Sequence, residues 1–192
     1  MYQEGLRRYG FHGISYEYIC TQIKEPKMIV AHLGSGCSLA AIKEGQVIDT
    51  TMGFSPTGGV MMGTRSGDID PGVIFYLLKE KNYSADDLEH LLNHESGLLG
   101  VSEISADIHQ LLKEEKGGFA IDLFCYQVKK AIGALSAALG GASLVVFTGG
   151  IGENSEEIRS KIMEGFQIPH QVIKTDEELM IAKHMQKLLE AH

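Results

Sequence analysis

The alternation of apolar and polar positions predicts three short strands early in the chain. Residues 28–33, 38–42 and 46–50 are rich in apolar side chains, and the turns GSG and KEG separate them. Short apolar runs joined by glycine-containing turns are typical of antiparallel hairpins. We therefore expect a three-stranded antiparallel meander from residue 28 to residue 50.

The segment that follows the meander has neither a helical nor a strand pattern. Residues 52–67, MGFSPTGGVMMGTRSG, include five glycines. A loop of this length without regular structure usually has a function. We therefore expect a functional loop here.

Beyond residue 70 the apolar positions recur at helical spacing, and polar caps or glycines bound each run. The expected helices are one capped by Asp70 with Pro71 at its first position, one from Ser84 to about Gly97, one from Ser105 to about Gly117, and one from Phe119 to Leu139. The last of these has a continuous apolar stripe, which predicts that one face is buried.

The remaining chain predicts strands that alternate with helices. Residues 144–147 form a continuous apolar run, typical of a central strand buried on both faces. A glycine turn and a helix follow, and as an ordinary turn this segment would have Asn154 as the helix cap. A short strand at 171–174 and a last helix, opened by a capping box of Thr175 and Glu178, complete the pattern. We expect a single α/β domain with a mixed sheet and flanking helices.

Composition narrows the classes of partner. The chain has 17 Lys and Arg against 25 Asp and Glu, a net charge of −8, which argues against nucleic acid or an anionic membrane as the main partner. No apolar run approaches the roughly 18 residues of a membrane span. Three cysteines without a CxxC pair indicate neither a disulfide framework nor a zinc site. We therefore expect a cytoplasmic protein.

Glycine is more frequent than in a typical globular protein, with 23 residues, and the glycines cluster in turns between apolar runs. Residues 32–36 and 149–154 are two such turns, and backbone N–H groups at glycine turns can bind phosphate oxygens. Each is also compatible with an ordinary tight turn. Two phosphate-binding candidates in one chain are more informative than either alone.

Two further side chains are candidates for phosphoryl chemistry. Arg65 lies in a flexible glycine loop from which its guanidinium could clamp a phosphoryl group, although an ion pair with Asp68 or Asp70 is an equal alternative. His12, near two arginines, could donate to developing negative charge. A purely structural histidine is the alternative there.

Together these segments resemble the acetate kinase family of acetate and propionate kinases, which has the actin-like, sugar-kinase and Hsp70-type (ribonuclease H-like) ATPase fold. The matching blocks, in family order, are RRYGFHGIS, HLGSGCSLAAIKEG, DTTMGFSPTGGVMMGTRSGDIDPG, ESGLLGVS, FTGGIGENS and TDEELMIA. The resemblance implies transfer of the γ-phosphoryl group of ATP to a short-chain carboxylate, which gives an acyl phosphate and ADP with Mg²⁺. It also implies a homodimer.

The resemblance implies roles for individual residues. His12 and Arg65 resemble the pair that stabilises the transferring phosphoryl group, and Glu177 resembles the Mg²⁺ ligand. Three stretches resemble the nucleotide-binding segments: His32, Leu33, Gly34, Ser35 and Gly36; Asp107, Ile108 and His109; and Gly150, Ile151, Gly152, Glu153 and Asn154.

Several positions depart from the family pattern. Ser35 stands where Asn is usual, His109 where Arg is usual and Tyr16 where His is common. The stretch between residues 158 and 175 is shorter than in relatives. The chain resembles the C-terminal lobe alone, without the N-terminal lobe that completes the carboxylate site.

We therefore expect a truncated or split portion of an acetate kinase, inactive alone, which a separately encoded N-terminal lobe could complement. The alternatives are half of a propionate kinase or a non-catalytic nucleotide-binding or dimerisation module.

Overall fold

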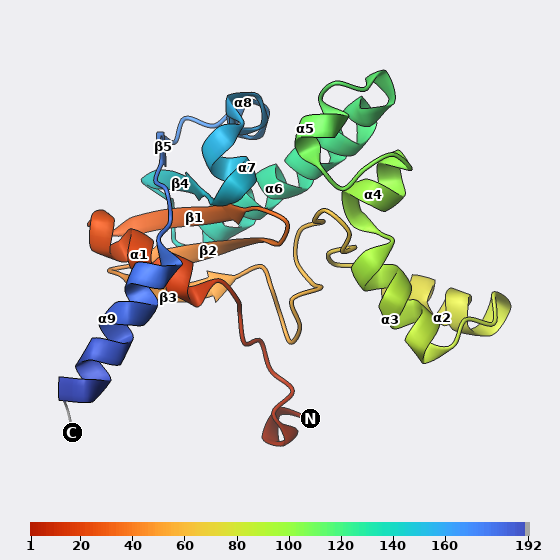
Figure 1. Cartoon of the computed structure of the whole chain (residues 1–192), viewed down its shortest axis with the longest axis horizontal. Coiled ribbons are helices and arrows are strands. Elements are labelled where there is room, and N and C mark those ends of the chain that lie inside the picture. The colour runs from red at the N-terminus through yellow and green to blue at the C-terminus, as the bar shows by residue number, and fades with distance from the viewer. Residues whose placement is uncertain (191–192) are drawn as a thin grey trace.

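A five-stranded mixed sheet forms the centre of the protein (Figure 1), whose computed structural model describes residues 1–190. The strands, in spatial order, are β3 (Gln46–Thr50), β2 (Cys37–Lys43), β1 (Lys27–Leu33), β4 (Leu144–Thr148) and β5 (His170–Val172). Strands β1, β2 and β3 pair antiparallel, whereas β1 pairs parallel with β4 and β4 with β5. The predicted meander, central strand and mixed sheet are confirmed, and β5 begins one residue before the predicted strand.

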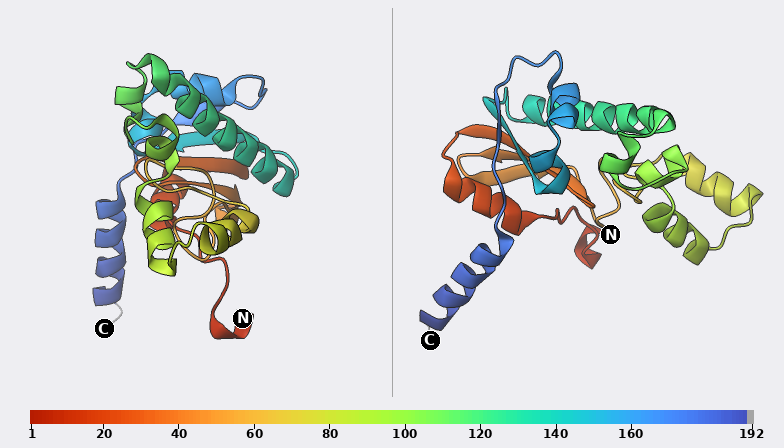
Figure 2. Two further views of the ribbon diagram at one scale, coloured as in Figure 1. Left: turned by 90° about the vertical axis from the view of Figure 1, so that its right-hand side faces the viewer. Right: turned by 45° about the horizontal axis from the view of Figure 1, so that its top comes forward.

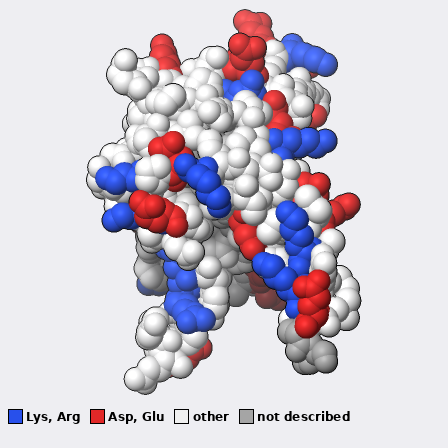
Figure 3. Space-filling model, turned by 90° about the vertical axis from the view of Figure 1, so that its left-hand side faces the viewer, with Lys and Arg blue, Asp and Glu red and all other residues white. Residues whose placement is uncertain are grey.

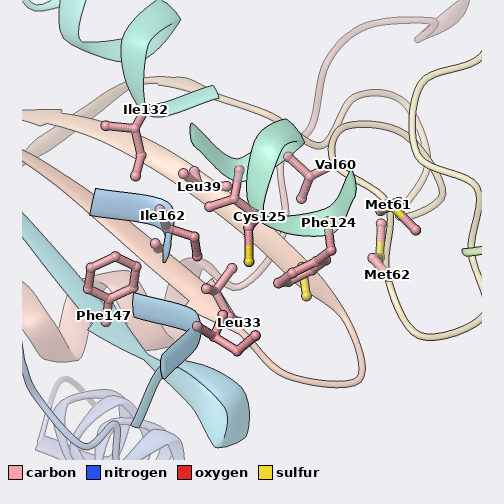
Figure 4. Packing of buried hydrophobic residues seen from close by; sticks show 14 of the residues in the cluster. Leu33, Leu39, Val60, Met61, Met62, Phe124, Cys125, Ile132, Phe147 and Ile162 are labelled. Carbon is pink, nitrogen blue, oxygen red and sulfur yellow. The ribbon is translucent and has the colours of Figure 1, made fainter. Parts of the chain in front are cut away.

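Helices cover both faces of the sheet (Figure 2). On one face α6 (Gly118–Ala138) and α8 (Glu156–Met163) pack against alternate strand residues, and Figure 4 shows Leu33, Leu39 and Phe147 facing Phe124 and Ile162. On the other face α1 (Gly13–Gln22) covers a smaller cluster. Burial on both faces explains why β1 and β4 are continuously apolar.

The other described helices are η1 (Tyr2–Glu4), α2 (Pro71–Glu80), α3 (Ala85–His94), α4 (Gly97–Ser102), α5 (Ile108–Leu111), η2 (Glu115–Gly117), α7 (Gly149–Asn154) and α9 (Glu177–Glu190). Asp70 caps α2, and Ser84 caps α3 in a capping box with Asp87, as the sequence predicts. Within residues 1–190 no helix is long and apolar enough to cross a bilayer.

The predicted limits of two helices are wrong. Helix α3 ends at His94, and Gly97 instead begins α4, because its φ of +62° brings it against the Met62 carbonyl, where a Cβ would lie 2.2 Å from the oxygen. The predicted helix from Ser105 to Gly117 is divided into α5 and η2. Its cap is Asp107, whose carboxylate accepts the His109 N–H.

Two predicted caps are also wrong. The turn before α8 is itself the short helix α7, so Asn154 lies at its end and the Ser155 side chain caps α8. Before α9, Asp176 Oδ1 accepts the Leu179 N–H at 2.9 Å, which is the bond expected of a capping residue. Thr175 Oγ1, the expected cap, is buried with no hydrogen-bond partner among the described residues.

Candidate functional site

The site lies where β1 and β4 end side by side. In their parallel pairing His32 is opposite Thr148, so the turn after β1 and the start of α7 meet. From this point the chain runs outward to β2 on one side, and to β5 on the other. Such a switch in direction at the carboxyl ends of strands leaves a crevice in which α/β proteins bind ligands.

An open cleft of about 590 Å³ occupies this position, which is within the usual range for ligand pockets. Its lining residues are His12, His32, Gly34, Ser35, Gly36, Gly149, Gly150, Glu153, Lys174, Thr175 and Glu177. Four segments that are distant in the sequence therefore converge. The resemblance named most of these residues, but it did not name Gly149, Lys174 or Thr175.

Glycine at position 149 makes the convergence possible. Gly149 has a φ of +78°, and a Cβ there would lie 2.7 Å from the Leu33 carbonyl oxygen. Such a contact excludes any side chain, so α7 can begin this close to β1 only at a glycine. The next residue differs, because no atom lies within 4 Å of a Cβ placed on Gly150. Gly150 therefore faces the open cleft.

Glu153 connects the end of β4 to the segment before α9. Its Oε1 accepts hydrogen bonds from the Thr148 hydroxyl at 3.2 Å, the Gly149 N–H at 2.9 Å and the Thr175 N–H at 3.2 Å. Three donors on one carboxylate oxygen fix all three segments. Although the resemblance counts Glu153 among the nucleotide-binding residues, this oxygen is engaged within the protein.

Glu177, the first residue of α9, lies in the cleft despite the short connection before it. Its carboxylate has no hydrogen-bond or ion-pair partner among the described residues, whereas the neighbouring Glu153 is engaged. Mg²⁺ at nucleotide sites is usually held by one or two carboxylates together with phosphate oxygens and water. A single free carboxylate fits that requirement, although residues 1–190 contain no group of three or more metal-ligating side chains.

His12 lies at the start of α1 with a left-handed φ of 62°. Its ring stacks on His32, with 4.1 Å between ring centroids, and its Nδ1 lies 2.7 Å from Ser38 Oγ. Burial, and to a smaller extent His32 and Arg65, lower the pKa of His12 from 6.5 to about 4, although Glu177 opposes the shift. Burial also lowers the pKa of His32. Both rings are therefore neutral at pH 7.

Arg65 lies beside His12 behind Gly36. A Cβ on Gly36 would lie 3.3 Å from Arg65 Nη1 and 3.5 Å from His12 Nε2. The alternative ion pairs are not formed, because Asp68 accepts the Gly59 N–H and Asp70 caps α2. The guanidinium instead contacts the Pro56 carbonyl at 3.4 Å.

The remaining predicted nucleotide-binding residues do not line the cleft. Gly63 lies between the predicted stretch 107–109 and the β1–β2 turn, since its Cβ would be 3.3 Å from the oxygen of the adjoining Ala106 and 3.8 Å from the Ser35 oxygen. The others are Asp107 and His109 in the α5 cap, the buried Leu33 and Ile108, Ile151 and Gly152 packed on the core, and Asn154, whose amide donates to the Gly150 carbonyl.

Sequence reasoning missed three polar residues behind the histidines. Ser38, Ser15 and Tyr16 are buried and contact His12, His32 and Ser38, respectively. A signal was available for Ser38, because it is the one polar residue in an otherwise apolar strand run.

Comparison with known proteins shows the family of the chain. The family model described as the Acetokinase family matches residues 1–187. The chain belongs to the acetokinase family. An acetate kinase from Clostridium novyi is 39% identical, with 98% of this chain and 57% of the relative covered.

Two solved structures of family members have the same fold. The Porphyromonas gingivalis acetate kinase superposes with a TM-score of 0.93 and 35% identity, over 98% of this chain and 57% of that one. A propionate kinase from Francisella tularensis superposes with a TM-score of 0.88 and 33% identity, over 94% of this chain and 56% of that one. The predicted fold class is confirmed, and the chain spans little more than half the length of these acetokinases.

The matched region differs in length between this chain and a relative. The region matched in the Clostridium novyi relative is 227 residues long, which exceeds the 192 residues of this chain. The relative therefore has residues within the matched region that this acetokinase chain lacks.

We predict that stability falls as the pH decreases from 7 to 5. The unfolded chain binds protons at its histidines near pH 6.5, whereas folded His12 resists protonation until about pH 4, so acid favours unfolding. His12→Asn, which tolerates the left-handed backbone, should reduce this loss by on the order of 1 kcal/mol after allowance for solvent screening.

Urea denaturation at the two pH values measures the loss. Equal losses in both proteins, together with an NMR titration of His12 near pH 6.5, would contradict this account.

Proposed function

We propose that this chain binds Mg²⁺ with ADP or ATP in the cleft and provides the phosphoryl-transfer residues of an acetate-kinase-type enzyme. In the proposed reaction a carboxylate oxygen of acetate attacks the γ-phosphorus of ATP. The bond from that phosphorus to the bridging oxygen breaks, and acetyl phosphate and ADP form. The observation that carries the proposal is the convergence of His12, the 32–36 turn, Gly150 and Glu177 on one cleft.

Charge at the cleft supports this chemistry. The transferring phosphoryl group spreads negative charge over its equatorial oxygens, and preorganised donors lower the barrier. Arg65 supplies a permanent cation, and His12, neutral at pH 7, supplies a hydrogen bond rather than a charge. Glu177 would hold Mg²⁺ together with the nucleotide phosphates. When bound, the ion would neutralise phosphate charge.

Backbone groups would hold the nucleotide. The N–H groups of Gly34 and Gly149 are engaged within the protein, so the other N–H groups of the 32–36 turn and of the start of α7 would bind phosphate. Gly150 leaves space for a phosphate to approach the backbone. The stretch 107–109 lies on the other side of Gly63 from the 32–36 turn. The part of the nucleotide beyond the phosphates would extend toward it. Ser35 and His109 offer fewer donors than the usual Asn and Arg, so we expect weakened nucleotide affinity.

We propose that these 192 residues have little transfer activity alone. The cleft described here is open, and phosphoryl transfer requires exclusion of water. The relatives are almost twice as long, and a separately encoded lobe is the partner that would complete the site. Acetate and propionate remain alternative acceptors, because family members of both names match.

We also propose a cytoplasmic location, since the three cysteines are free and two of them are buried.

Gly150→Val should weaken binding of Mg²⁺ and ADP by at least about tenfold, which calorimetry can measure. The valine would extend into the cleft from a Cβ that has no atom within 4 Å, so the fold should persist. Gly133→Val is the matched control, because Gly133 also has no atom within 4 Å of its Cβ position but lies in α6, outside the cleft. The proposed nucleotide site would be overturned if calorimetry detects no binding of millimolar ADP to the unmodified chain, or if both variants bind with equal affinity.

The chain with acetate, ATP and Mg²⁺ should form acetyl phosphate far more slowly than the roughly 10 per second of a typical enzyme. A hydroxamate assay measures the product directly. Turnover near that ordinary rate would show that this chain needs no further lobe.

We propose that a second copy of the chain covers α2. This helix contains Val73, Phe75 and Tyr76, yet it buries none of its residues, and exposed apolar patches mark interaction sites.

Light scattering should find a dimer that Phe75→Lys converts to monomer. Phe119→Lys, at a 71% exposed site on α6, should leave it intact. A monomeric unmodified chain would contradict dimerisation.

A further inference from the structure

We propose that Tyr16 and Ser38 act as positioning residues that fix the tautomer of His12, so that its Nε2 carries the hydrogen and faces the transferring phosphoryl group. The consequence for transfer rests on the proposed function. The tautomer itself is a property of the chain without nucleotide.

A chain of hydrogen bonds connects the three side chains. Ser38 Oγ lies 2.7 Å from His12 Nδ1, and the Tyr16 hydroxyl forms a short hydrogen bond with the same Ser38 oxygen. Tyr16 is 2% exposed and Ser38 is fully buried. Bulk water is therefore excluded from both hydroxyls, and protein groups set the order of their hydrogens.

The number of hydroxyl hydrogens permits two donor–acceptor orders along this chain of hydrogen bonds. Ser38 has one hydroxyl hydrogen and two neighbours, so it either donates to His12 and accepts from Tyr16, or the reverse. In the first order the phenol, the strongest donor present, starts the chain, and the imidazole nitrogen, the strongest acceptor, ends it. Burial raises the pKa of Tyr16, which keeps its hydrogen in place.

The reverse order is less favourable. His12 Nδ1 would have to donate to the serine, and the Tyr16 hydrogen would have to go to Thr50 Oγ1, which itself donates to the Leu39 carbonyl at 2.9 Å. The best acceptor of the group would then receive no hydrogen bond. The first order therefore prevails, with Nδ1 unprotonated and the hydrogen on Nε2.

This tautomer determines what His12 presents to the cleft. Nε2 and Arg65 Nη1 approach the same point beside Gly36, at 3.5 Å and 3.3 Å from its Cβ position. With the hydrogen on Nε2, both groups are donors to phosphoryl oxygens. With the opposite tautomer, a nitrogen lone pair would repel those oxygens. The stacked ring of His32 restrains the plane of His12.

The phenol of Tyr16 gives the hydrogen-bond chain its direction. A phenol donates one hydrogen and remains neutral, so it imposes a direction that an imidazole, with two interchangeable nitrogens, does not.

Nitrogen NMR of ¹⁵N-histidine-labelled protein without nucleotide tests the proposal at pH 7, because protonated and unprotonated ring nitrogens have well-separated shifts. The spectrum of His12→Asn assigns the His12 signals. We expect a protonated Nε2 and an unprotonated Nδ1 in the unmodified chain. Ser38→Ala should shift both signals toward averaged positions, and Tyr16→Phe should do so by a smaller amount.

Circular dichroism establishes that each variant is folded, and if Ser38→Ala fails to fold, the tautomer of the unmodified chain still tests the proposal. A protonated Nδ1 in the unmodified chain, or unchanged signals in a folded Ser38→Ala, would overturn the proposal. Unchanged signals in Tyr16→Phe would remove Tyr16 from it. Failure to bind Mg²⁺ and ADP would instead overturn the proposed function and leave the tautomer result intact.

Discussion

The contact between Gly149 and the end of β1 is the constraint on which the cleft depends. A side chain at this position would lie within 3 Å of the Leu33 backbone, so only glycine lets α7 start against the turn of the meander. From there Glu153 reaches back to the Gly149 N–H and across to the Thr175 N–H. One close backbone approach thereby places Gly150 beside the 32–36 turn and keeps Glu177 in the cleft.

The proposed phosphate chemistry must be reconciled with an acidic protein. The net charge of −8 would repel a polyphosphate at long range, and basic and acidic side chains are interspersed over the face seen in Figure 3. Under the proposed function, attraction would be local, from Arg65 beside Gly36, from Lys174 in the cleft lining and from backbone N–H groups. Neutral histidines suit such a site, because they donate hydrogen bonds without paying the cost of a buried charge.

Much of this arrangement could be predicted from local sequence. The meander, α6 and the caps Asp70 and Ser84 follow from periodicity and capping chemistry. The predictions at Gly97 and Asn154 are wrong because tertiary contacts determine where these helices begin and end. Gly97 lies against the Met62 carbonyl, and the glycines of α7 lie against β1. The hydrogen bond from Thr175 to Glu153 and the network of Ser38 with Tyr16 join residues distant in the sequence, so no periodicity could reveal them.

The central claim is that separate segments form one nucleotide cleft, and a ¹H–¹⁵N titration of the chain with Mg²⁺ and ADP tests it most directly. The account predicts amide shifts concentrated in residues 32–36, 149–154 and 174–177, the three backbone segments that line the cleft. The absence of shifts, or shifts confined to residues away from the carboxyl ends of β1 and β4, would contradict it.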